Sequence, residues 1–112
     1  DAILVGRGTY NADKPRLDVR LPGLAERSPE RWLLTRSGRA PRGWHALRSP
    51  GRITRMADIQ WLMVEGAAET ARAFLAEGLV DRLMLYRAPV TAGDHLPNFR
   101  IAPWLDCLWI TQ

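Results

Sequence analysis

The chain has 112 residues, of which 46% are hydrophobic, enough for a single domain with one core over residues 1–112. No apolar run approaches the ~20 residues of a membrane helix, and no basic leader precedes the apolar start, so we expect neither a membrane span nor a signal peptide. The single cysteine, Cys107, excludes an intrachain disulfide and a cysteine-based zinc cluster, and it favours a reducing compartment, here the cytoplasm.

The formal net charge is +4, and Lys14 is the only lysine, so arginine carries nearly all of the positive charge. These arginines are scattered along the chain and do not form the basic stripe that nucleic-acid-binding proteins usually present. Arginine forks bind phosphate and carboxylate groups in a bidentate manner, which favours a phosphorylated small molecule over nucleic acid. The alternative is an arginine-biased, solvated surface, which would explain most of the same residues.

The first predicted element is a buried strand over Ala2–Val5, an apolar run too short for a helix. The next four residues, Gly6–Thr9, contain two glycines that allow close backbone approach, and Thr9 adds a hydroxyl. Residues 10–15 are polar and typical of a turn, and residues 17–20 alternate between apolar and polar. This part of the chain therefore predicts a strand followed by a polar, turn-rich connection.

A second strand is predicted over Arg31–Thr35, and a basic loop that begins at Arg36 follows it directly. Residues 43–53 are rich in loop-forming residues, and Trp44–Leu47 is a candidate short strand within them. Residues 54–60 show no clear pattern and receive no assignment, and Met56 among them is uninformative.

The clearest unit in the sequence is a strand, a tight turn, a helix and a second strand in succession. Trp61–Val64 is a short apolar run typical of a buried strand, and Glu65–Ala68 interrupts it. A helix is predicted over Glu69–Glu77, with Ala73 and Phe74 on its buried stripe. Gly78 suits its end because glycine turns left-handed at no steric cost. A strand at Leu83–Tyr86 completes a βαβ unit, and such crossovers build parallel sheets.

The last segment is predicted to close the sheet. Residues 90–97 have the composition of a loop, and residues 98–102 and 105–111 could form an antiparallel strand pair. Strands that alternate with helical or looped connections indicate an α/β domain. We expect a mostly parallel central sheet with flanking helices and an antiparallel C-terminal strand pair.

Three predicted strands end in residues that suit a nucleotide. The first strand is followed by Gly6–Thr9, the second by Arg36 and the third by Glu65–Ala68. Ligands of open parallel sheets bind outside the carboxyl ends of the strands. Small residues at the start of the predicted helix let backbone N–H groups approach an anion, and the helix dipole adds to the attraction. The alternative is that these small residues serve close packing and that Glu65 is a helix cap or first-turn acid.

The Arg36-Ser37 pair suits a ribose 2′-phosphate, which favours NADP(H) over NAD(H). Other chemistries have less support, since the chain has no persuasive Ser-His-Asp or Cys-His arrangement and no P-loop or GxGxxG pattern. His45 and His95 are both in predicted loops. Metal-ligand spacings such as HxxxH and CxxC are absent, so we expect no metal site.

Two blocks of sequence resemble a known family. The first is Ala2–Thr9 (AILVGRGT) followed by Ala12-Asp13, Pro15, Leu17 and Val19-Arg20. The second is Val64-Glu65-Gly66, Glu69-Thr70, Gly78–Asp81 and Leu85–Pro89. In this order the blocks, which span roughly half of the chain, resemble the C-terminal reductase domain of the bifunctional riboflavin-biosynthesis deaminase–reductases, the RibD family.

The resemblance implies a dihydrofolate-reductase-like fold. It also implies NADPH-dependent reduction of 5-amino-6-(5-phosphoribosylamino)uracil to 5-amino-6-(5-phosphoribitylamino)uracil in riboflavin biosynthesis. In that reaction the hydride goes to the sugar carbon that bears the amine, in its ring-opened form. A homodimer is the assembly that the resemblance suggests.

The resemblance also assigns roles to individual residues. Leu17, Arg20 and Glu65 would contact the phosphorylated pyrimidine substrate, with Arg20 as a phosphate partner. The residues that would contact NADPH are Thr9, Asp13, Arg36, Gly66, Ala67, Ala68, Glu69 and Thr70. No catalytic residue is assigned.

Departures from the family pattern support other hypotheses. The family has a further strand and helix before the position of Asp1, so the chain resembles a truncated domain. Ala67 stands where the family usually has the second glycine of a pair, and Lys14 stands where it has an aspartate. The alternative function is a degenerate or truncated, non-catalytic nucleotide-binding domain. A third hypothesis is a related reductase of a pterin or another heterocycle, which would not need Arg20.

Overall fold

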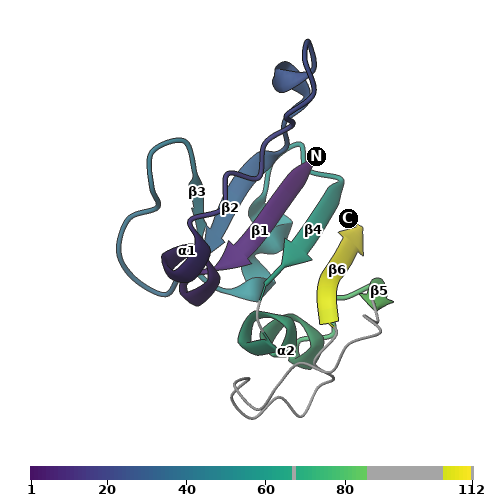
Figure 1. Cartoon of the computed structure of the whole chain (residues 1–112). Helices are drawn as coiled ribbons and strands as arrows, with labels where there is room; N and C mark the ends of the chain where they lie inside the picture. Colours follow the sequence, from purple (N-terminus) through teal and green to yellow (C-terminus); the bar gives the residue numbers. More distant parts are fainter. Residues whose placement is uncertain (67, 86–104, 112) are drawn as a thin grey trace, which may run out of the picture.

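The computed structural model describes residues 1–66, 68–85 and 105–111, which are arranged around a central sheet (Figure 1). Within these ranges the sheet has six strands in the order β3-β2-β1-β4-β6-β5. In chain order the elements are β1 (Ala2–Gly6), α1 (Arg7–Asp13), the 3₁₀ helix η1 (Ala25–Arg27), β2 (Glu30–Leu34), β3 (His45–Leu47), the 3₁₀ helix η2 (Pro50–Arg55), β4 (Trp61–Glu65), α2 (Ala68–Ala76), β5 (Arg82–Leu85) and β6 (Leu105–Thr111).

β1 pairs in parallel with β2 on one side and with β4 on the other, and Ala2 lies opposite both Glu30 and Leu62 in these pairings. β2 pairs in parallel with β3. These four strands therefore point in one direction, and their carboxyl ends lie at the same edge of the sheet. The mostly parallel sheet and its first strands are confirmed.

β6 lies between β4 and β5 and runs antiparallel to both. The sequence predicted an antiparallel pair at the C-terminal end, and β6 supplies one member of it with β4 and β5 as its partners. Residues 98–102, predicted as the other member, lie outside the described residues. β5 confirms the second strand of the βαβ unit, and β6 separates it from β4.

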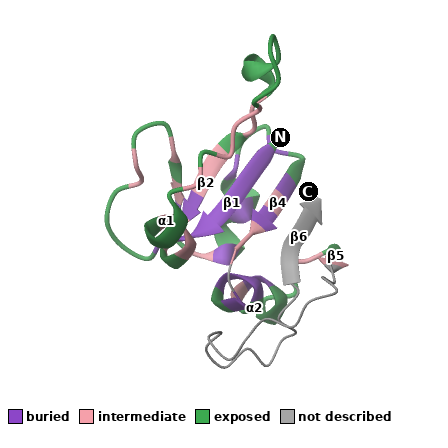
Figure 2. Ribbon diagram, in the orientation of Figure 1, coloured by how far each residue is buried: buried purple, intermediate pink, exposed green. Residues whose placement is uncertain are grey.

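Every residue of β1 is buried, which explains its unbroken apolar sequence (Figure 2). Alternate side chains of a strand point to opposite faces of the sheet, so Ala2 and Leu4 pack on one face and Ile3 and Val5 on the other. η2 and α2 cover the first face, and α1 lies over the second face beside β1 and β2 (Figure 1).

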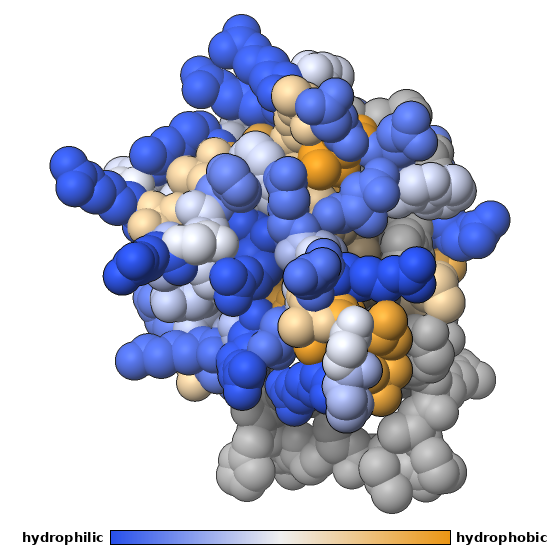
Figure 3. All heavy atoms as spheres, turned by 90° about the horizontal axis from the view of Figure 1, so that it is seen from above, coloured by the Kyte–Doolittle hydropathy of each residue, from blue (hydrophilic) through white to orange (hydrophobic). Residues whose placement is uncertain are grey.

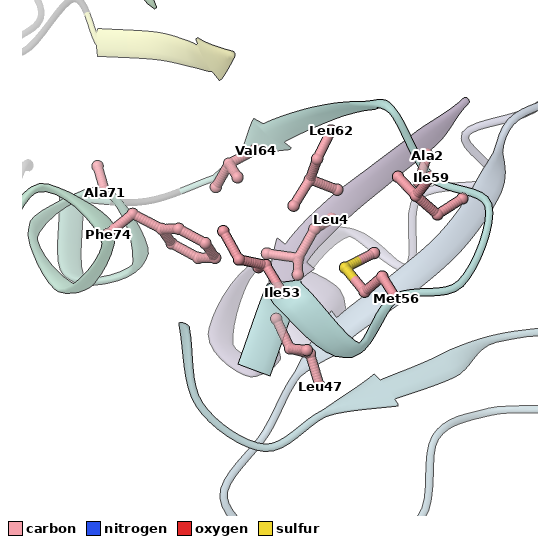
Figure 4. Packing of buried hydrophobic residues seen from close by; sticks show 10 residues of the cluster. All are labelled: Ala2, Leu4, Leu47, Ile53, Met56, Ile59, Leu62, Val64, Ala71 and Phe74. Carbon is pink, nitrogen blue, oxygen red and sulfur yellow. The ribbon is translucent and has the colours of Figure 1, made fainter. Parts of the chain in front are cut away.

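The main hydrophobic cluster fills the space between the first face of the sheet, η2 and α2 (Figure 4). Leu4, Leu62 and Phe74 are fully buried in it. Burying one such side chain contributes roughly 1.5–3 kcal/mol relative to leaving it in water. These three side chains are therefore major contributors to the stability of the fold, and they attach α2 to the two central strands.

η2 and the residues after it add a part of the core that the sequence analysis did not assign. Pro50, Ile53, Met56 and Ile59 occur at every third position, and all four are buried. Side chains three residues apart line up on one face of a 3₁₀ helix, so η2 turns the first two toward the sheet. The interpretation of Met56 as uninformative was wrong, since it is a core residue at 4% exposure.

α2 confirms the predicted helix, shifted by one residue toward the N-terminus. Phe74 is buried, as the sequence indicated, whereas Ala73, predicted on the same stripe, is only half-buried. The helix ends at Ala76, and Gly78 shortly after it has a φ of 65°, while the N–H of Leu79 donates to the Phe74 carbonyl at 3.2 Å. Glycine adopts this left-handed conformation without a steric cost, and the conformation lets the N–H groups that follow the helix donate to its last carbonyl groups.

α1 corrects the expectation of a turn-like connection over residues 10–15. The helix contains no buried residue, so it lacks the apolar stripe by which a helix is recognised in a sequence. It ends at Lys14, which is left-handed with a φ of 43° and donates its N–H to the Tyr10 carbonyl at 2.8 Å. None of the helices in the described ranges is long and apolar enough to cross a membrane.

Candidate functional site

Three turns that follow neighbouring parallel strands lie together at the carboxyl-terminal edge of the sheet (Figure 1). β1 leads from Gly6 into α1, β2 leads into a basic loop that starts at Thr35, and β4 leads from Glu65 into the turn before α2. We call residues 6–9, 35–39, 65–66 and 68–70 together the carboxyl rim. The sequence analysis expected such a rim, and ligands of open parallel sheets bind at this edge.

The turns after β1 and β4 approach each other through glycines. A β-carbon on Gly6 would clash with the hydroxyl of Thr70, and a β-carbon on Gly66 would lie 3.2 Å from Thr9 Oγ1. Gly66 also has a φ of 145°, a conformation that other residues rarely adopt. The structure thus brings three of the predicted cofactor residues, Thr9, Gly66 and Thr70, into one cluster.

Arg7 joins the turn after β1 to the loop after β2. Its Nε and Nη2 donate to Thr35 Oγ1 at 3.3 and 3.1 Å, and its Nη2 also donates to the Arg39 carbonyl at 3.1 Å. The sequence analysis did not foresee this link. A signal was present, because Thr35 ends an apolar strand, and a buried hydroxyl in that position needs a hydrogen-bond partner.

The other predicted cofactor residues lie on the segments that follow β1, β2 and β4. Arg36 is exposed in the loop after β2, and Asp13 is exposed at the end of α1. In the first turn of α2, Ala68 is buried and Glu69 is exposed. Ala67 lies outside the described residues.

The three predicted substrate residues do not come together in one chain. Glu65 is half-buried at the carboxyl rim, whereas Leu17 and Arg20 lie on the segment that returns from α1 to the amino end of β2. The N–H of Val19 on this segment donates to Ser28 Oγ at 3.0 Å, shortly before β2 begins. Arg20 is therefore near the amino-terminal edge of the sheet, at the far side from Glu65.

At the amino-terminal edge, where the surface is mainly hydrophilic (Figure 3), Asp18 lies between two arginines. Its Oδ2 accepts a hydrogen bond from Arg16 Nη2 at 2.7 Å, and Arg20 Nε lies 3.6 Å from Oδ1. Desolvation works to raise the pKa of Asp18, but the hydrogen bond and charge of Arg16, with the charge of Arg20, lower that pKa below its ordinary 3.8. Arg20, the predicted phosphate partner, is paired with a carboxylate here.

An open cavity of about 500 Å³ lies at this amino-terminal edge and was not predicted. Its lining includes Asp18, Ser28, Glu30, Arg31 and His45. Because parallel sheets bind their ligands at the other edge, we place the candidate functional site at the carboxyl rim.

The donors at the carboxyl rim fit a phosphorylated nucleotide. The Thr9 hydroxyl, the Arg36 guanidinium and the backbone N–H groups at the start of α2 are all suited to phosphate oxygens. Glycines at positions 6 and 66 let the two turns come close to each other and to a ligand. In the part of the chain that the structure describes, no three His, Cys, Asp or Glu side chains gather into a metal site.

An open, mostly parallel sheet with such a rim defines the class of α/β proteins that bind ligands at their strand ends. The family model of the RibD C-terminal domain matches residues 52–100 of the chain. A riboflavin biosynthesis protein RibD from Corynebacterium ammoniagenes is 31% identical over 115 residues, which cover 86% of this chain and 33% of that protein. A protein of the same name from Mycobacterium tuberculosis (strain H37Rv) is 32% identical over 107 residues, which cover 83% of this chain and 31% of that protein.

The chain belongs to the RibD C-terminal domain family, as the sequence blocks around the first and fourth strands predicted. Its α/β fold with a parallel central sheet agrees with that membership. The chain spans about a third of the length of the curated relatives it matches.

Proposed function

We propose that the chain is a reductase domain of riboflavin biosynthesis that uses NADPH to reduce 5-amino-6-(5-phosphoribosylamino)uracil to 5-amino-6-(5-phosphoribitylamino)uracil. Membership of the RibD C-terminal domain family and the names of the two relatives support the pathway. The observation that carries the proposal is the junction of Gly6, Thr9, Gly66 and Thr70, where the turns after two neighbouring parallel strands meet at the carboxyl rim.

In this proposal the carboxyl rim holds the phosphate groups of the cofactor. The turn before α2 supplies backbone N–H groups for the pyrophosphate, and the dipole of α2 attracts its negative charge. Thr9 adds a hydroxyl beside this turn, because it lies next to Gly66. Arg36 supplies a guanidinium for the 2′-phosphate, and Asp13 is a further cofactor contact at the end of α1.

When bound, the nicotinamide supplies a hydride to the ring-opened sugar carbon that bears the amine. Glu65 is the residue of the carboxyl rim that we place against the pyrimidine, because it ends β4 directly before Gly66. The side chains of the rim orient the substrate, and its arginines balance the negative charge of the phosphates.

The test combines activity with binding. NADPH oxidation in the presence of the pyrimidine substrate is followed by the loss of reduced-nicotinamide absorbance, and NADPH affinity is measured by fluorescence titration. We expect Arg36→Ala and Thr9→Val each to bind NADPH roughly tenfold more weakly, because each loses a polar contact to a charged ligand. Asn11→Ala, at an exposed position on α1, is the control. Normal affinity in both test variants would remove the cofactor assignment.

A second candidate function is nucleotide binding without catalysis. The distance between the segment of Leu17 and Arg20 and the rim residue Glu65 favours it, since the substrate residues do not converge within one chain. NADPH binding without its oxidation by the pyrimidine substrate would support this second function. NADPH oxidation with a phosphate-free pterin instead would indicate a related reductase.

We also propose that the chain forms a homodimer. β3 and β5 are the outer strands of the described sheet, and Leu83 on β5 is 49% exposed. A strand at a sheet edge presents backbone groups that can pair with another chain. The molar mass from sedimentation equilibrium, measured over a range of protein concentrations, tests the dimer, and a monomeric mass throughout would contradict it.

A further inference from the structure

The loop after β2 is held by an arginine from the neighbouring turn. Arg7 donates from Nε and Nη2 to Thr35 Oγ1, at 3.3 and 3.1 Å. Its Nη2 also donates to the carbonyl oxygens of Ser37, at 3.5 Å, and of Arg39, at 3.1 Å. Thr35 Oγ1 in turn donates to the Ser37 carbonyl at 2.6 Å. One guanidinium group therefore fixes both ends of loop 35–39 to the start of α1.

Arg48, which follows β3, holds the same loop. Its Nη1 donates to the Gly38 carbonyl at 2.7 Å and to the Thr35 carbonyl at 3.4 Å. Together with Arg7, it gives each of four carbonyl oxygens in loop 35–39 a guanidinium donor. Carbonyl oxygens are the negative ends of the peptide dipoles, so these contacts reduce the repulsion that an anion near the loop would meet.

The charged side chains in this part of the sequence are all positive. Between Glu30 and Asp58 there are seven arginines and no acidic residue. Arg36 and Arg39 are exposed on the loop, and neither forms an ion pair with a described residue. Two guanidinium groups are therefore presented on a held loop, without a carboxylate partner among the described residues.

We propose that Arg7 is a positioning residue for the 2′-phosphate of NADPH: it holds loop 35–39 so that Arg36 and Arg39 bind a phosphate that Arg7 does not touch. The inference rests on the proposed function. A loop that is already held in its bound conformation loses less conformational freedom when the ligand binds, and so binds more tightly. Arg7 thereby sets the preference for NADPH over NADH.

This role needs the shape of arginine as well as its charge. A guanidinium group presents five N–H donors in a rigid plane, whereas a lysine ammonium donates from a single nitrogen. Lysine at position 7 would keep the charge but lose the simultaneous contacts to Thr35 and Arg39. Arg7→Lys therefore separates positioning from simple electrostatic attraction.

The experiment measures dissociation constants of the full chain for NADPH and NADH by fluorescence titration. In Arg7→Ala and Arg7→Lys we expect NADPH to bind roughly tenfold more weakly, while NADH binding changes less than about twofold. Arg27→Ala removes an exposed arginine on η1 and controls for net charge, so it should leave both constants unchanged. Wild-type NADPH affinity in Arg7→Lys, or equal losses for both cofactors in Arg7→Ala, would overturn the inference.

A double-mutant cycle tests whether Arg7 acts through Arg36. Positioning predicts that Arg7→Ala has a smaller effect once Arg36 is alanine, because the two residues then share one interaction with the phosphate. Fully additive losses would mean that Arg7 contacts the ligand by itself, which contradicts the inference. Thr35→Val removes the Oγ1 acceptor at nearly constant volume, and it replaces Arg7→Ala in the cycle if that variant does not fold.

Hydrogen exchange of the ligand-free chain gives a readout that needs no cofactor. The amides of loop 35–39 should exchange faster in Arg7→Ala and Arg7→Lys than in the wild type, since the loop loses its anchor. Unchanged exchange in both variants would contradict a positioning role.

The wild-type constants separate this inference from the proposed function. A wild type that binds NADPH no better than NADH would remove both the cofactor assignment and the role of Arg7. A wild type that prefers NADPH, with the same preference in Arg7→Ala, would remove only the role of Arg7.

Discussion

The hydroxyl of Thr70 in α2 fills the space in which a side chain of Gly6 would begin, so β1 and α2 meet without a β1 side chain between them. Thr70 is buried, and its β-branched side chain has few alternative rotamers in a helix. This contact sets how closely α2 approaches the end of β1, and with it the position of the turn that precedes α2.

Gly6→Ala should therefore destabilise the fold. The added methyl group must displace Thr70 or move α2, and overpacking of this kind costs about 1–3 kcal/mol. The free energy of unfolding in urea measures the change. Gly8→Ala is the matched control, because its added β-carbon has nothing within 4 Å. Since Gly8 lies within α1, we expect this control to be neutral or to stabilise by about 0.5–1 kcal/mol.

Thr70→Ala provides the background that tests the cause. It removes the hydroxyl that a β-carbon on Gly6 would meet first, so Gly6→Ala should cost clearly less there than in the wild type. If Gly6→Ala lowered the free energy of unfolding equally in the wild type and in Thr70→Ala, Thr70 would not be the side chain that opposes the added methyl group.

Ile53 connects η2 to the hydrophobic cluster under the sheet and is 4% exposed. Ile53→Ala should lower the free energy of unfolding by about 2–5 kcal/mol, and Ile53→Val by about 0.5–1.5 kcal/mol, because each leaves a cavity of a different size. Arg52→Ala, at an exposed position on the same 3₁₀ helix, should change it by less than about 0.5 kcal/mol. If both Ile53 variants lost less unfolding free energy than about 0.5 kcal/mol, the value expected of the Arg52→Ala control, η2 would not be part of the cooperatively unfolding core.

The strands and α2 were predictable because each has a recognisable pattern of apolar residues or a terminating glycine in the sequence. β1 is an apolar run because it is covered on both faces. β4 also begins with four apolar residues, although it buries only Leu62 and Val64, and Trp61 is 48% exposed. α2 combines Phe74 on its buried side with Gly78 at its end. These features depend on local spacing and on burial, which a sequence records directly.

α1 and η2 were not predictable from the periods of an ordinary helix or strand. α1 buries no residue, so its sequence carries no apolar stripe. η2 buries Pro50 and Ile53, and Met56 and Ile59 continue the same spacing beyond its end. A strict repeat of three fits a 3₁₀ helix, whereas an α-helix mixes spacings of three and four and a strand repeats every two residues. A search for that spacing would have found Ile53 and Met56.

The candidate site was predictable in part. The cluster of Thr9, Gly66 and Thr70 follows from the parallel order of β1 and β4, since parallel neighbours end at one edge of the sheet. The bond between Arg7 and Thr35 depends on the conformation of a loop. The sequence indicates that the Thr35 hydroxyl needs a hydrogen-bond partner, but no local pattern identifies Arg7 as that partner. Nor does a local pattern specify the long return from α1 to β2, which carries Arg20 away from the rim.

The stability contributed by Asp18 should depend on pH. Its folded pKa is lowered by Arg16 and Arg20 against the opposing effect of desolvation, so the ionised form is favoured in the folded state. That contribution is present above the ordinary pKa of 3.8 and is lost as the pH falls through the lower folded value. Asp18→Asn should therefore be less stable than the wild type at neutral pH, and the difference should shrink in acid.

Urea unfolding of both proteins from neutral pH to about pH 3 measures this difference, across the range in which aspartate titrates. Adding salt should reduce the difference too, since the Arg16 side chain is 74% exposed. Arg16→Gln is the matching variant, and Asp18→Asn should have a smaller effect in its background. A stability difference that stays constant between neutral and acid pH would contradict the ion-pair explanation.

Gly66 should matter for both folding and cofactor binding. Its φ of 145° is a conformation that only glycine adopts readily, and a β-carbon there would lie 3.2 Å from Thr9 Oγ1. Gly66→Ala should therefore lose about 1–3 kcal/mol of stability through backbone strain. It should also bind NADPH more weakly, because the turn before α2 and the Thr9 hydroxyl are both displaced from the phosphate groups.

Gly78→Ala separates strain in general from strain at the site. Gly78 also has a positive φ, of 65°, but its added β-carbon would meet nothing within 4 Å, and it lies at the other end of α2. This control should lose roughly 1–2 kcal/mol of stability, the cost of a left-handed residue with a side chain, and keep the wild-type affinity for NADPH. Urea unfolding and fluorescence titration of both variants give the comparison. Wild-type NADPH affinity in a folded Gly66→Ala chain would mean that the cofactor does not bind at the turn between β4 and α2.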